Sequence, residues 1–250
     1  MMKKILKMID QFVLGGLLLS YKRRKMINQQ LAYKKETFNL GMTFRYPDNS
    51  DSLLNLLCTK YGSDKGEVNK DNLPYLNQNH TYTDFYELLF QLNRSGIKNV
   101  LECGILNGAS LRVWRDYFEN AEVIGIDIDK TSLFNEERIR TFHCDQTSVE
   151  SIKGFIDKAK IKTKSLDVVI DDGLHEFFAG VCLFENLIDC LAPNGFYIIE
   201  DVVGSDYLKY KDYFADKSES FIARFIILDS PRLVPTGDNR LIVVSKIKGI

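Results

Sequence analysis

Carboxylates recur along the middle of this 250-residue chain, each directly after a short apolar run. They are Asp127, Asp145, the pair Asp171 and Asp172, and the pair Glu200 and Asp201. A short apolar run is typical of a buried strand in a parallel sheet, and ligands bind where the carboxyl ends of such strands meet. Because charged groups gathered at one edge are costly without partners, these acids predict a site for cations, ribose hydroxyls or water.

A glycine turn before the first acid predicts a nucleoside cofactor. The run from Glu102 to Ser110 reads E-x-G-x-x-x-G-x-S, and Gly104 and Gly108 permit a tight turn close to a ligand. Asp127 falls 25 residues after Glu102, as one strand–helix–strand unit requires, and an acid there accepts hydrogen bonds from both hydroxyls of a ribose. The alternative is a turn whose glycines serve only packing. The missing G-x-G-x-x-G disfavours a nicotinamide-dependent oxidoreductase.

The acids of the two later strands predict a metal site. They lie in the segments IDDGLH, residues 170–175, and IIED, residues 198–201. Carboxylates that converge from adjacent strand ends suit a hard divalent cation with positions left for substrate, and no Cys/His cluster suggests zinc. His175 lies three residues after Asp172, where anions and a metal would tune its pKa toward working pH. We interpret His175 as functional, against the alternative of a structural histidine.

The simplest interpretation assigns each group of acids to a different part of the bound cofactor and substrate. Asp127 takes the ribose of the cofactor, and Asp145 with Gln146 takes its base. The two later pairs of acids then face a substrate beyond the cofactor. Tyr61, Ser63 and Lys65 are candidates for the entrance of the site, and His80 and Tyr82 precede a helix that is a candidate cap.

The elements that position these residues alternate between strand and helix. Strands are predicted over 99–103, 122–126, 139–144, 166–170 and 196–199, and helices over 52–61, 82–92, 109–118, 149–159, 177–191 and 207–214. A Pro193-Asn194-Gly195 turn closes the fifth of these helices. Two closing strands, 221–228 and 241–246, have no helix between them and predict an antiparallel hairpin at one edge. The fold class is therefore α/β, a doubly wound, mostly parallel seven-stranded sheet.

Composition bounds the class of protein. The chain is 45% hydrophobic and 27% charged, as in soluble globular proteins, and its length suits one domain with an appendage. A net charge of −1 argues against a nucleic-acid partner. The five cysteines are scattered and form no C-x-x-C pair. We interpret them as buried free thiols in a reducing compartment, and predict a cytoplasmic protein.

Residues 1–50 are predicted to form a helical arm that precedes a domain over residues 51–250. Basic residues flank the apolar run 12–19, which is too short to span a bilayer and is followed by no small-residue cleavage site. Two interpretations stay open: an arm that packs on the domain or on a second subunit, and an amphipathic helix on an anionic membrane surface. We favour protein packing, and so expect a homo-oligomer without membrane contact.

The order of the motifs resembles one known group of enzymes. YGSDKG at 61–66, HTYTDFYELLF at 80–90, the glycine turn, GIDID at 125–129, DQ at 145–146, IDDGLH and IIED follow one another. This series resembles class I S-adenosylmethionine-dependent methyltransferases, and among them the metal-dependent sugar O-methyltransferases of the macrolide-sugar and cephalosporin-hydroxylase-like group. The resemblance covers about residues 58–201. It implies a Rossmann-like methyltransferase fold, S-adenosylmethionine, and a divalent metal, Mg or Mn.

The resemblance also assigns roles to residues. It implies Asp172, Glu200 and Asp201 as metal ligands and His175 as the general base. Leu174 stands where a small polar residue is common in that group. The cofactor-binding residues expected from the glycine turn, the interpretation above and the resemblance are Glu102, Gly104, Gly108, Ser110, Asp127, Asp145, Gln146 and Asp171.

The function expected from the resemblance is methyl transfer to a hydroxyl of a sugar, either nucleotide-linked or a precursor in polysaccharide biosynthesis at the cell surface. The first alternative is an O-methyltransferase for a non-sugar small molecule, since vicinal oxygens of any diol chelate a metal. The second is a non-catalytic scaffold that binds S-adenosylmethionine.

Overall fold

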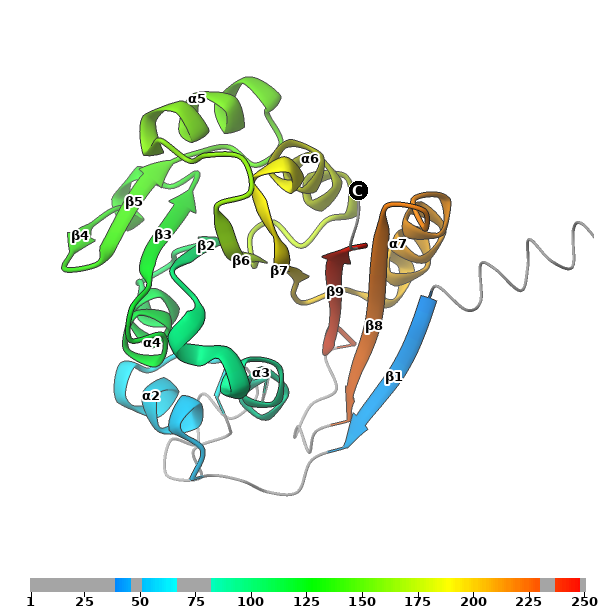
Figure 1. Cartoon of the computed structure of the whole chain (residues 1–250), viewed down its shortest axis with the longest axis horizontal. Helices are drawn as coiled ribbons and strands as arrows, with labels where there is room; N and C mark the ends of the chain where they lie inside the picture. The colour runs from blue at the N-terminus through cyan, green and yellow to red at the C-terminus, as the bar shows by residue number, and fades with distance from the viewer. Residues whose placement is uncertain (1–38, 46–50, 67–81, 230–236, 248–250) are drawn as a thin grey trace, which may run out of the picture.

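The computed structural model describes residues 39–45, 51–66, 82–229 and 237–247. Its described strands form a single mixed sheet with helices on both faces (Figure 1). The order across the sheet is β1-β8-β9-β7-β6-β2-β3-β5-β4. The strands are β1 (Asn39–Arg45), β2 (Asn99–Cys103), β3 (Glu122–Asp127), β4 (Asn135–Glu136), β5 (Ile139–His143), β6 (Leu166–Asp171), β7 (Leu191–Ile199), β8 (Phe221–Asp229) and β9 (Arg240–Lys246).

The central strands end together, as their acids predicted. β7, β6, β2, β3 and β5 pair in parallel, and Cys103 of β2 is in register with Ile126 of β3 and with Asp171 of β6. Val100 and Leu101 are fully buried, because helices cover both faces of these strands. The doubly wound α/β class is thus confirmed, and the carboxyl ends of five strands form one edge.

The sheet has nine described strands rather than the predicted seven. The two additional strands are β4, which is only two residues long, and β1, which the arm prediction included. The β8–β9 pair is antiparallel as predicted, but β1 pairs in parallel with β8 and takes the edge. Residues 1–38 lie outside the described residues, so the helical arm and its packing stay predictions.

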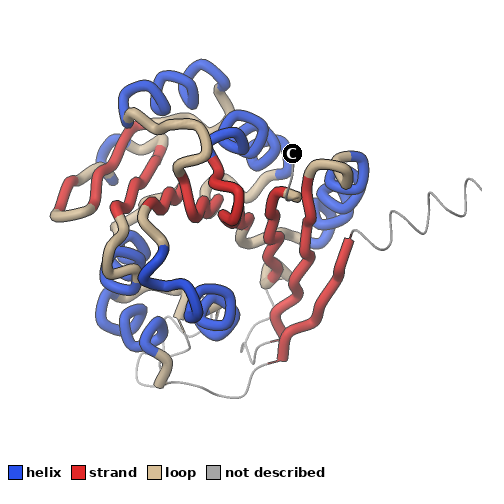
Figure 2. The backbone as a smooth tube through the Cα atoms, in the orientation of Figure 1, coloured by secondary structure: helices blue, strands red, loops and turns tan. Residues whose placement is uncertain are grey.

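In the part of the chain that the structure describes, helices lie on both faces of the sheet (Figures 1 and 2). One face carries α5 (Val149–Ala159), α6 (Phe177–Leu187) and α7 (Gly204–Asp216), and the other carries α2 (Leu53–Tyr61), α3 (Thr83–Phe90) and α4 (Ala109–Tyr117). Short 3-10 turns follow at Gln91–Gly96, Lys130–Ser132 and Ile188–Cys190. The apolar sides of these helices pack against the strands or, for α2, against α4 and α3, so two hydrophobic clusters form, one on each face.

The predicted end of one helix and the predicted start of the strand after it are wrong. The helix expected over 177–191 ends at Leu187, and β7 begins at Leu191 instead of residue 196. Leu191 pairs with Leu166, and the register shifts between Leu166 and Val168. The predicted Pro193–Gly195 turn therefore lies within an irregular part of a strand, because pairing with β6 overrides the local turn preference.

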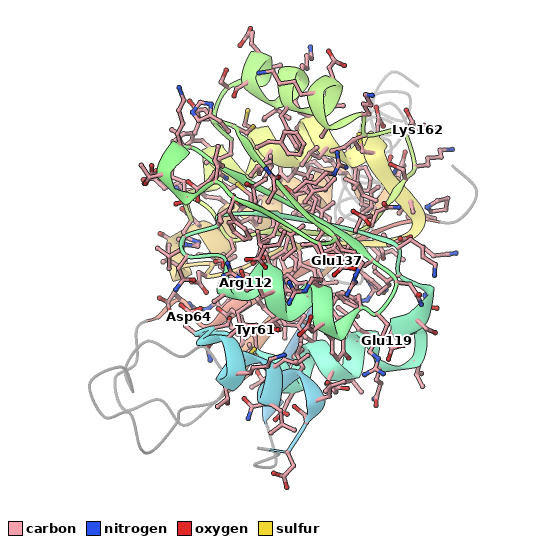
Figure 3. The ribbon with its side chains drawn as sticks, turned by 90° about the vertical axis from the view of Figure 1, so that its left-hand side faces the viewer. Tyr61, Asp64, Arg112, Glu119, Glu137 and Lys162 are labelled. Atoms are coloured by element: carbon pink, nitrogen blue, oxygen red, sulfur yellow. The ribbon has the colours of Figure 1, made fainter. Side chains whose placement is uncertain are left out.

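The end of α2 is fixed to α4 by a polar network. The Tyr61 hydroxyl donates to Asp116 Oδ2 at 2.5 Å, Lys60 Nζ donates to the same oxygen at 3.0 Å, and Arg115 Nε donates to Oδ1 at 2.8 Å. Burial raises the pKa of Asp116, but these three hydrogen bonds outweigh it and hold the pKa well below its usual range. Tyr61 lies beside α4, which also carries Arg112 (Figure 3). The network fixes the starting point of the loop 62–66.

All five cysteines are free, as predicted, and only Cys182 is not fully buried. Among the described helices, none combines the length and the apolar character that crossing a bilayer requires.

Candidate active site

The backbone of neighbouring strands holds the acids at the edge of the sheet. Glu102 belongs to β2, Asp171 ends β6, and Glu200 directly follows β7. The Asp172 amide donates to Cys103 O, and the Glu200 amide donates to Asp171 O, each at 3.0 Å. These bonds extend the sheet by one step and bring the two pairs of acids together.

Two residues of the edge adopt an unusual backbone conformation. His175 has φ 57° and Asp201 has φ 54°, in the left-handed region that residues other than glycine seldom occupy. Such conformations persist where the surrounding structure enforces them, and they cluster at functional sites. Here the two strained residues lie on different loops of the same acid cluster.

Lys65 lies inside the cluster rather than at its entrance. Its side chain is 3% exposed, and Nζ lies 2.5 Å from Asp172 Oδ2, 2.5 Å from Glu200 Oε2 and 3.4 Å from Glu102 Oε1. Burial lowers the pKa of the Lys65 ammonium, but the three carboxylates outweigh it and raise the pKa well above its usual range. Lys65 therefore carries a fixed positive charge among the acids.

Two tyrosines of the α3 segment complete the cluster. The Tyr82 hydroxyl donates to Asp201 Oδ1, and the Tyr86 hydroxyl donates to Glu200 Oε1. Both rings are fully buried. Both oxygens of Glu200 thus have partners, Lys65 and Tyr86. Three side chains from the sequence between β1 and β2 reach the edge, those of Lys65, Tyr82 and Tyr86.

Burial raises the pKa of three acids in this cluster, Glu102, Glu200 and Asp201. Burial is the largest cause for Glu102 and Asp201, and each pKa is raised to about 7. For Asp201 the neighbouring Asp172 adds to the rise, and the Tyr82 hydrogen bond opposes it. Glu200 has its pKa raised well above the usual range by burial, in spite of Lys65. Acids held so close to neutrality are typical of sites that bind cations or move protons.

Ligand atoms for a metal converge on one side of the cluster. One atom each from Asp172, His175 and Asp201 lies within 4.8 Å of the others, and His175 Nε2 is 3.9 Å from Asp172 Oδ1. The two carboxylates suit a hard divalent ion, so the oxygen donors fit the predicted metal, and the imidazole of His175 lies beside them. Among the described residues this group contains two of the three predicted ligands, while Glu200 is held by Lys65 and Tyr86.

The glycine turn brings the predicted cofactor site against the acid cluster. Gly104 has φ 93° and Gly108 has φ 76°. A Cβ at Gly104 would overlap the carbonyl group of Asp172, and a Cβ at Gly108 would overlap the Phe134 ring. Gly104 thus lets the turn run directly against the backbone of a predicted metal ligand.

Asp127 supports the same turn. Its Oδ2 accepts hydrogen bonds from the Ile105 amide at 2.8 Å and from the Leu106 amide at 3.4 Å. Its Oδ1 accepts from the Asp129 amide at 2.8 Å. The carboxylate is half-buried and each oxygen keeps a further lone pair, so the geometry leaves room for ribose hydroxyls.

Two predicted cofactor residues form a buried support instead of an open surface. Gln146 Nε2 donates to Asp171 Oδ1 at 3.1 Å, and Gln146 Oε1 accepts from the Leu174 amide at 2.8 Å. Burial raises the pKa of Asp171 to about 6. These contacts fix the loop 172–175 that carries His175. Their assignment to the cofactor stays a prediction.

The remaining predicted residues are placed as follows. Asp145 accepts from the amide and hydroxyl of Thr147 at the exposed end of β5. A hydrogen bond from Ser110 opposes the rise in the Glu102 pKa that burial causes, and Glu102 Oε2 accepts from Trp114 Nε1 at 3.0 Å. Leu174 is half exposed and only its backbone joins the network. His80 lies outside the described residues.

Three residues are buried in the cluster although the sequence does not predict them there. The sequence predicts Lys65 at the entrance and Tyr82 next to a candidate cap, and it gives no role to Tyr86. The available signal was the motif pair YGSDKG and HTYTDFYELLF, which names the residue types but not the sheet edge they reach.

These observations define a class of fold. A mostly parallel sheet with β9 inserted antiparallel between β7 and β8, a glycine turn after β2 and an acid at the end of β3 form the class I S-adenosylmethionine-dependent methyltransferase fold. No protein-family model matches the chain.

Curated relatives agree with this fold. The chain is 31% identical over 173 residues to 8-demethyl-8-alpha-L-rhamnosyl tetracenomycin-C 2'-O-methyltransferase of Streptomyces olivaceus. The matched segment makes up 66% of this chain and 42% of that protein. The chain is 34% identical over 130 residues to mycinamicin VI 2''-O-methyltransferase of Micromonospora griseorubida, covering 49% and 32%. The matches thus span less than half the length of these relatives.

Solved structures give the same result. MycE methyltransferase of the mycinamycin biosynthetic pathway, in complex with Mg, SAH and mycinamycin VI, is 30% identical with a TM-score of 0.50 over 59% of this chain and 36% of that chain. Its complex with Mg and SAH reaches a TM-score of 0.56 at 23% identity over 77% and 54%. The resemblance to sugar O-methyltransferases and the Rossmann-like methyltransferase fold are confirmed.

Proposed function

We propose that this chain is a metal-dependent O-methyltransferase that moves a methyl group from S-adenosylmethionine to a hydroxyl of a sugar. The observation that carries the proposal is the contact between its two subsites. The turn at Gly104 lies against Asp172, which in turn lies beside His175 and Asp201. A cofactor on the turn and a cation on the acids would thus be neighbours. Relatives named as sugar O-methyltransferases support this reading.

The residues divide the work of binding. Asp127 accepts hydrogen bonds from the ribose hydroxyls, and the turn from Gly104 to Gly108 approaches the rest of the cofactor closely. Asp172 and Asp201 would hold the divalent ion, with Glu200 as the further predicted ligand. When bound, S-adenosylmethionine supplies the methyl group and the ion lowers the pKa of a coordinated hydroxyl.

His175 serves as the general base. Its imidazole is 37% exposed beside Asp172, so it can reach a substrate at the open side of the edge. It takes the proton that the attacking hydroxyl loses. Asp171 and Gln146 hold the loop of His175 in place through their buried hydrogen bonds. Positioning of the reacting groups supplies the rest of the catalysis.

The acceptor is a sugar-bearing small molecule, free, nucleotide-linked or attached to a larger product. The net charge of −1 supports an acceptor other than nucleic acid. The five free thiols support a cytoplasmic protein. We further propose a homo-oligomer, on the basis of the apolar run at 12–19.

An acceptor screen tests this proposal. The protein is incubated with S-adenosylmethionine, Mg²⁺ and separate panels of nucleotide sugars, rhamnosides and catechols, and products are examined by mass spectrometry. We expect the gain of one methyl group on a sugar. Methylation confined to catechols would replace the sugar by a non-sugar diol, and tight cofactor binding without turnover on any panel would favour a scaffold.

A further inference from the structure

Lys65 is unusual in the acid cluster because its ammonium is buried among carboxylates. It comes from the loop after α2, far in sequence from the sheet edge, and its ammonium contacts carboxylates of β2 and of the segments after β6 and β7. Surface lysines keep their ammonium in water. This one is 2% exposed, so its charge acts on the cluster with little screening.

The backbone holds Lys65 in place from both sides. Gly62 ends α2 in the left-handed conformation, and the Ser63 amide donates to Cys58 O at 3.0 Å. The Lys65 carbonyl accepts from the Tyr82 amide at 2.9 Å. The lysine is therefore anchored to α2 on one side and to the α3 segment on the other.

The ammonium faces the same side chains that a divalent ion would use. Asp172 offers Oδ2 to Lys65 and Oδ1 to the side of His175. Glu200 offers Oε2 to Lys65 and Oε1 to Tyr86. A cation that takes further oxygens of these acids must share them with Lys65, and like charges at such distances repel strongly in a buried site.

We propose that Lys65 is a positioning residue of the metal site, which competes with the divalent ion for Asp172 and Glu200 and so limits how tightly the ion is held. The inference rests on the proposed function, because it takes these acids as the metal site. By holding Glu200 together with Tyr86, Lys65 also fixes the side of the cluster that stays free for the ion. Loss of its charge should strengthen metal binding.

Three variants test this inference. Lys65→Met keeps the length of the side chain and removes its charge, and Lys65→Gln keeps N–H donors without the charge. Lys60→Met is the matched control, because Lys60 lies nearby at the end of α2 but is exposed and pairs with Asp116. The full-length proteins are titrated with Mn²⁺ by calorimetry and unfolded by heat with and without Mn²⁺.

We expect both Lys65 variants to bind Mn²⁺ at least about tenfold more tightly than the wild type. Both should unfold at a lower temperature without Mn²⁺ and regain more of the difference with it, since buried carboxylates lose their partner. Lys60→Met should behave as the wild type. A variant that folds only with Mn²⁺ supports the inference.

Mn²⁺ affinity that is unchanged or weaker in both folded Lys65 variants would overturn the competition. Failure of both variants to fold, even with Mn²⁺, would assign Lys65 to stability alone and overturn it too. Titration with S-adenosylhomocysteine separates this result from the proposed function. A wild type that binds neither S-adenosylhomocysteine nor Mn²⁺ contradicts the function, whereas normal binding of both with unchanged Lys65 variants contradicts only the competition.

Discussion

Asp127 and Asp171 are both strand-end carboxylates, and their surroundings differ. Asp127 is half-buried and accepts hydrogen bonds from the Ile105 amide of the glycine turn and from the Asp129 amide. Asp171 is buried beneath the loop that carries His175, with Gln146 as its polar partner. The first carboxylate therefore keeps lone pairs for a ligand, while the second supports the site from below.

Replacement of Asp127 should weaken cofactor binding. In Asp127→Ala the ribose hydroxyls lose their acceptor, and the Ile105 amide loses its partner. We expect S-adenosylhomocysteine to bind about 1–3 kcal/mol more weakly by calorimetry. Asp157→Ala, an exposed position on α5, is the control. Equal affinity of a folded Asp127→Ala protein would remove Asp127 from the site.

Asp171 should make stability depend on pH. Burial raises its folded-state pKa to about 6, above the value of about 4 in the unfolded chain. The folded protein thus binds the proton more tightly, and the stability from this proton is lost as pH rises from about 4 through 6. In urea unfolding, Asp171→Asn should be more stable than the wild type at pH 8, by up to roughly 3 kcal/mol, and by less at pH 5. A difference that is equal at both pH values would argue against a protonated Asp171.

His175 should act on turnover rather than on binding. His175→Ala should fold, bind S-adenosylhomocysteine as before and lose about 10²–10⁴-fold in kcat. His143→Ala, at the exposed end of β5, is the control for loss of an imidazole. Near-normal kcat of His175→Ala would place the base elsewhere, and loss of Mn²⁺ binding would make His175 a ligand.

At the scale of elements, turns and loops decide how close the two subsites lie. Gly104 and Gly62 both have positive φ, but only Gly104 faces another backbone, that of Asp172. The loop 62–66 and α3 come from the opposite end of the domain sequence and cross to the same edge. The pattern of a short apolar strand followed by an acid therefore predicts the acids of the site, but not the side chains that the loop 62–66 and α3 add to it.

Replacing these glycines by alanine should distinguish the stability cost of backbone strain from the cost of a steric overlap. Gly62→Ala has no atom within 4 Å of the new Cβ and should cost only the backbone strain, about 1–2 kcal/mol. Gly104→Ala adds an overlap with Asp172 and should cost more in urea unfolding and also weaken cofactor binding. Gly154→Ala, within α5 and unobstructed, should stabilise by roughly 0.5–1 kcal/mol. Similar costs at Gly62 and Gly104 would contradict the close approach.

Local signals predict some of these elements and not others. The central strands and α4 follow from apolar runs and helical spacing, because their burial is set by their own sequence. β1 and β4 do not, since a strand exists only through its partner and these two are short or interrupted by Gly41. The same holds for Lys65, whose role depends on which acids it meets rather than on its neighbours in sequence.

For the whole molecule, the sheet gathers groups that lie far apart along the chain. The acids of β2, β6 and β7 meet at one edge because the strands are parallel, and a covering layer from residues 51–66 and 82–90 supplies one ammonium and two phenols. The acid edge was predictable from sequence, because strand ends coincide in a parallel sheet. The covering layer was not predictable from sequence, because no periodicity indicates which face of the sheet α2 and α3 cover.

The central claim is that methyl transfer to a sugar requires a divalent ion held at this edge. The most direct measurement compares methylation of the best sugar acceptor by untreated protein, chelator-treated protein, and chelator-treated protein supplied with Mg²⁺ or Mn²⁺. We predict loss of the methylated product after chelation and its recovery with either ion, with S-adenosylhomocysteine binding retained throughout. Undiminished product formation by metal-free protein would contradict the claim.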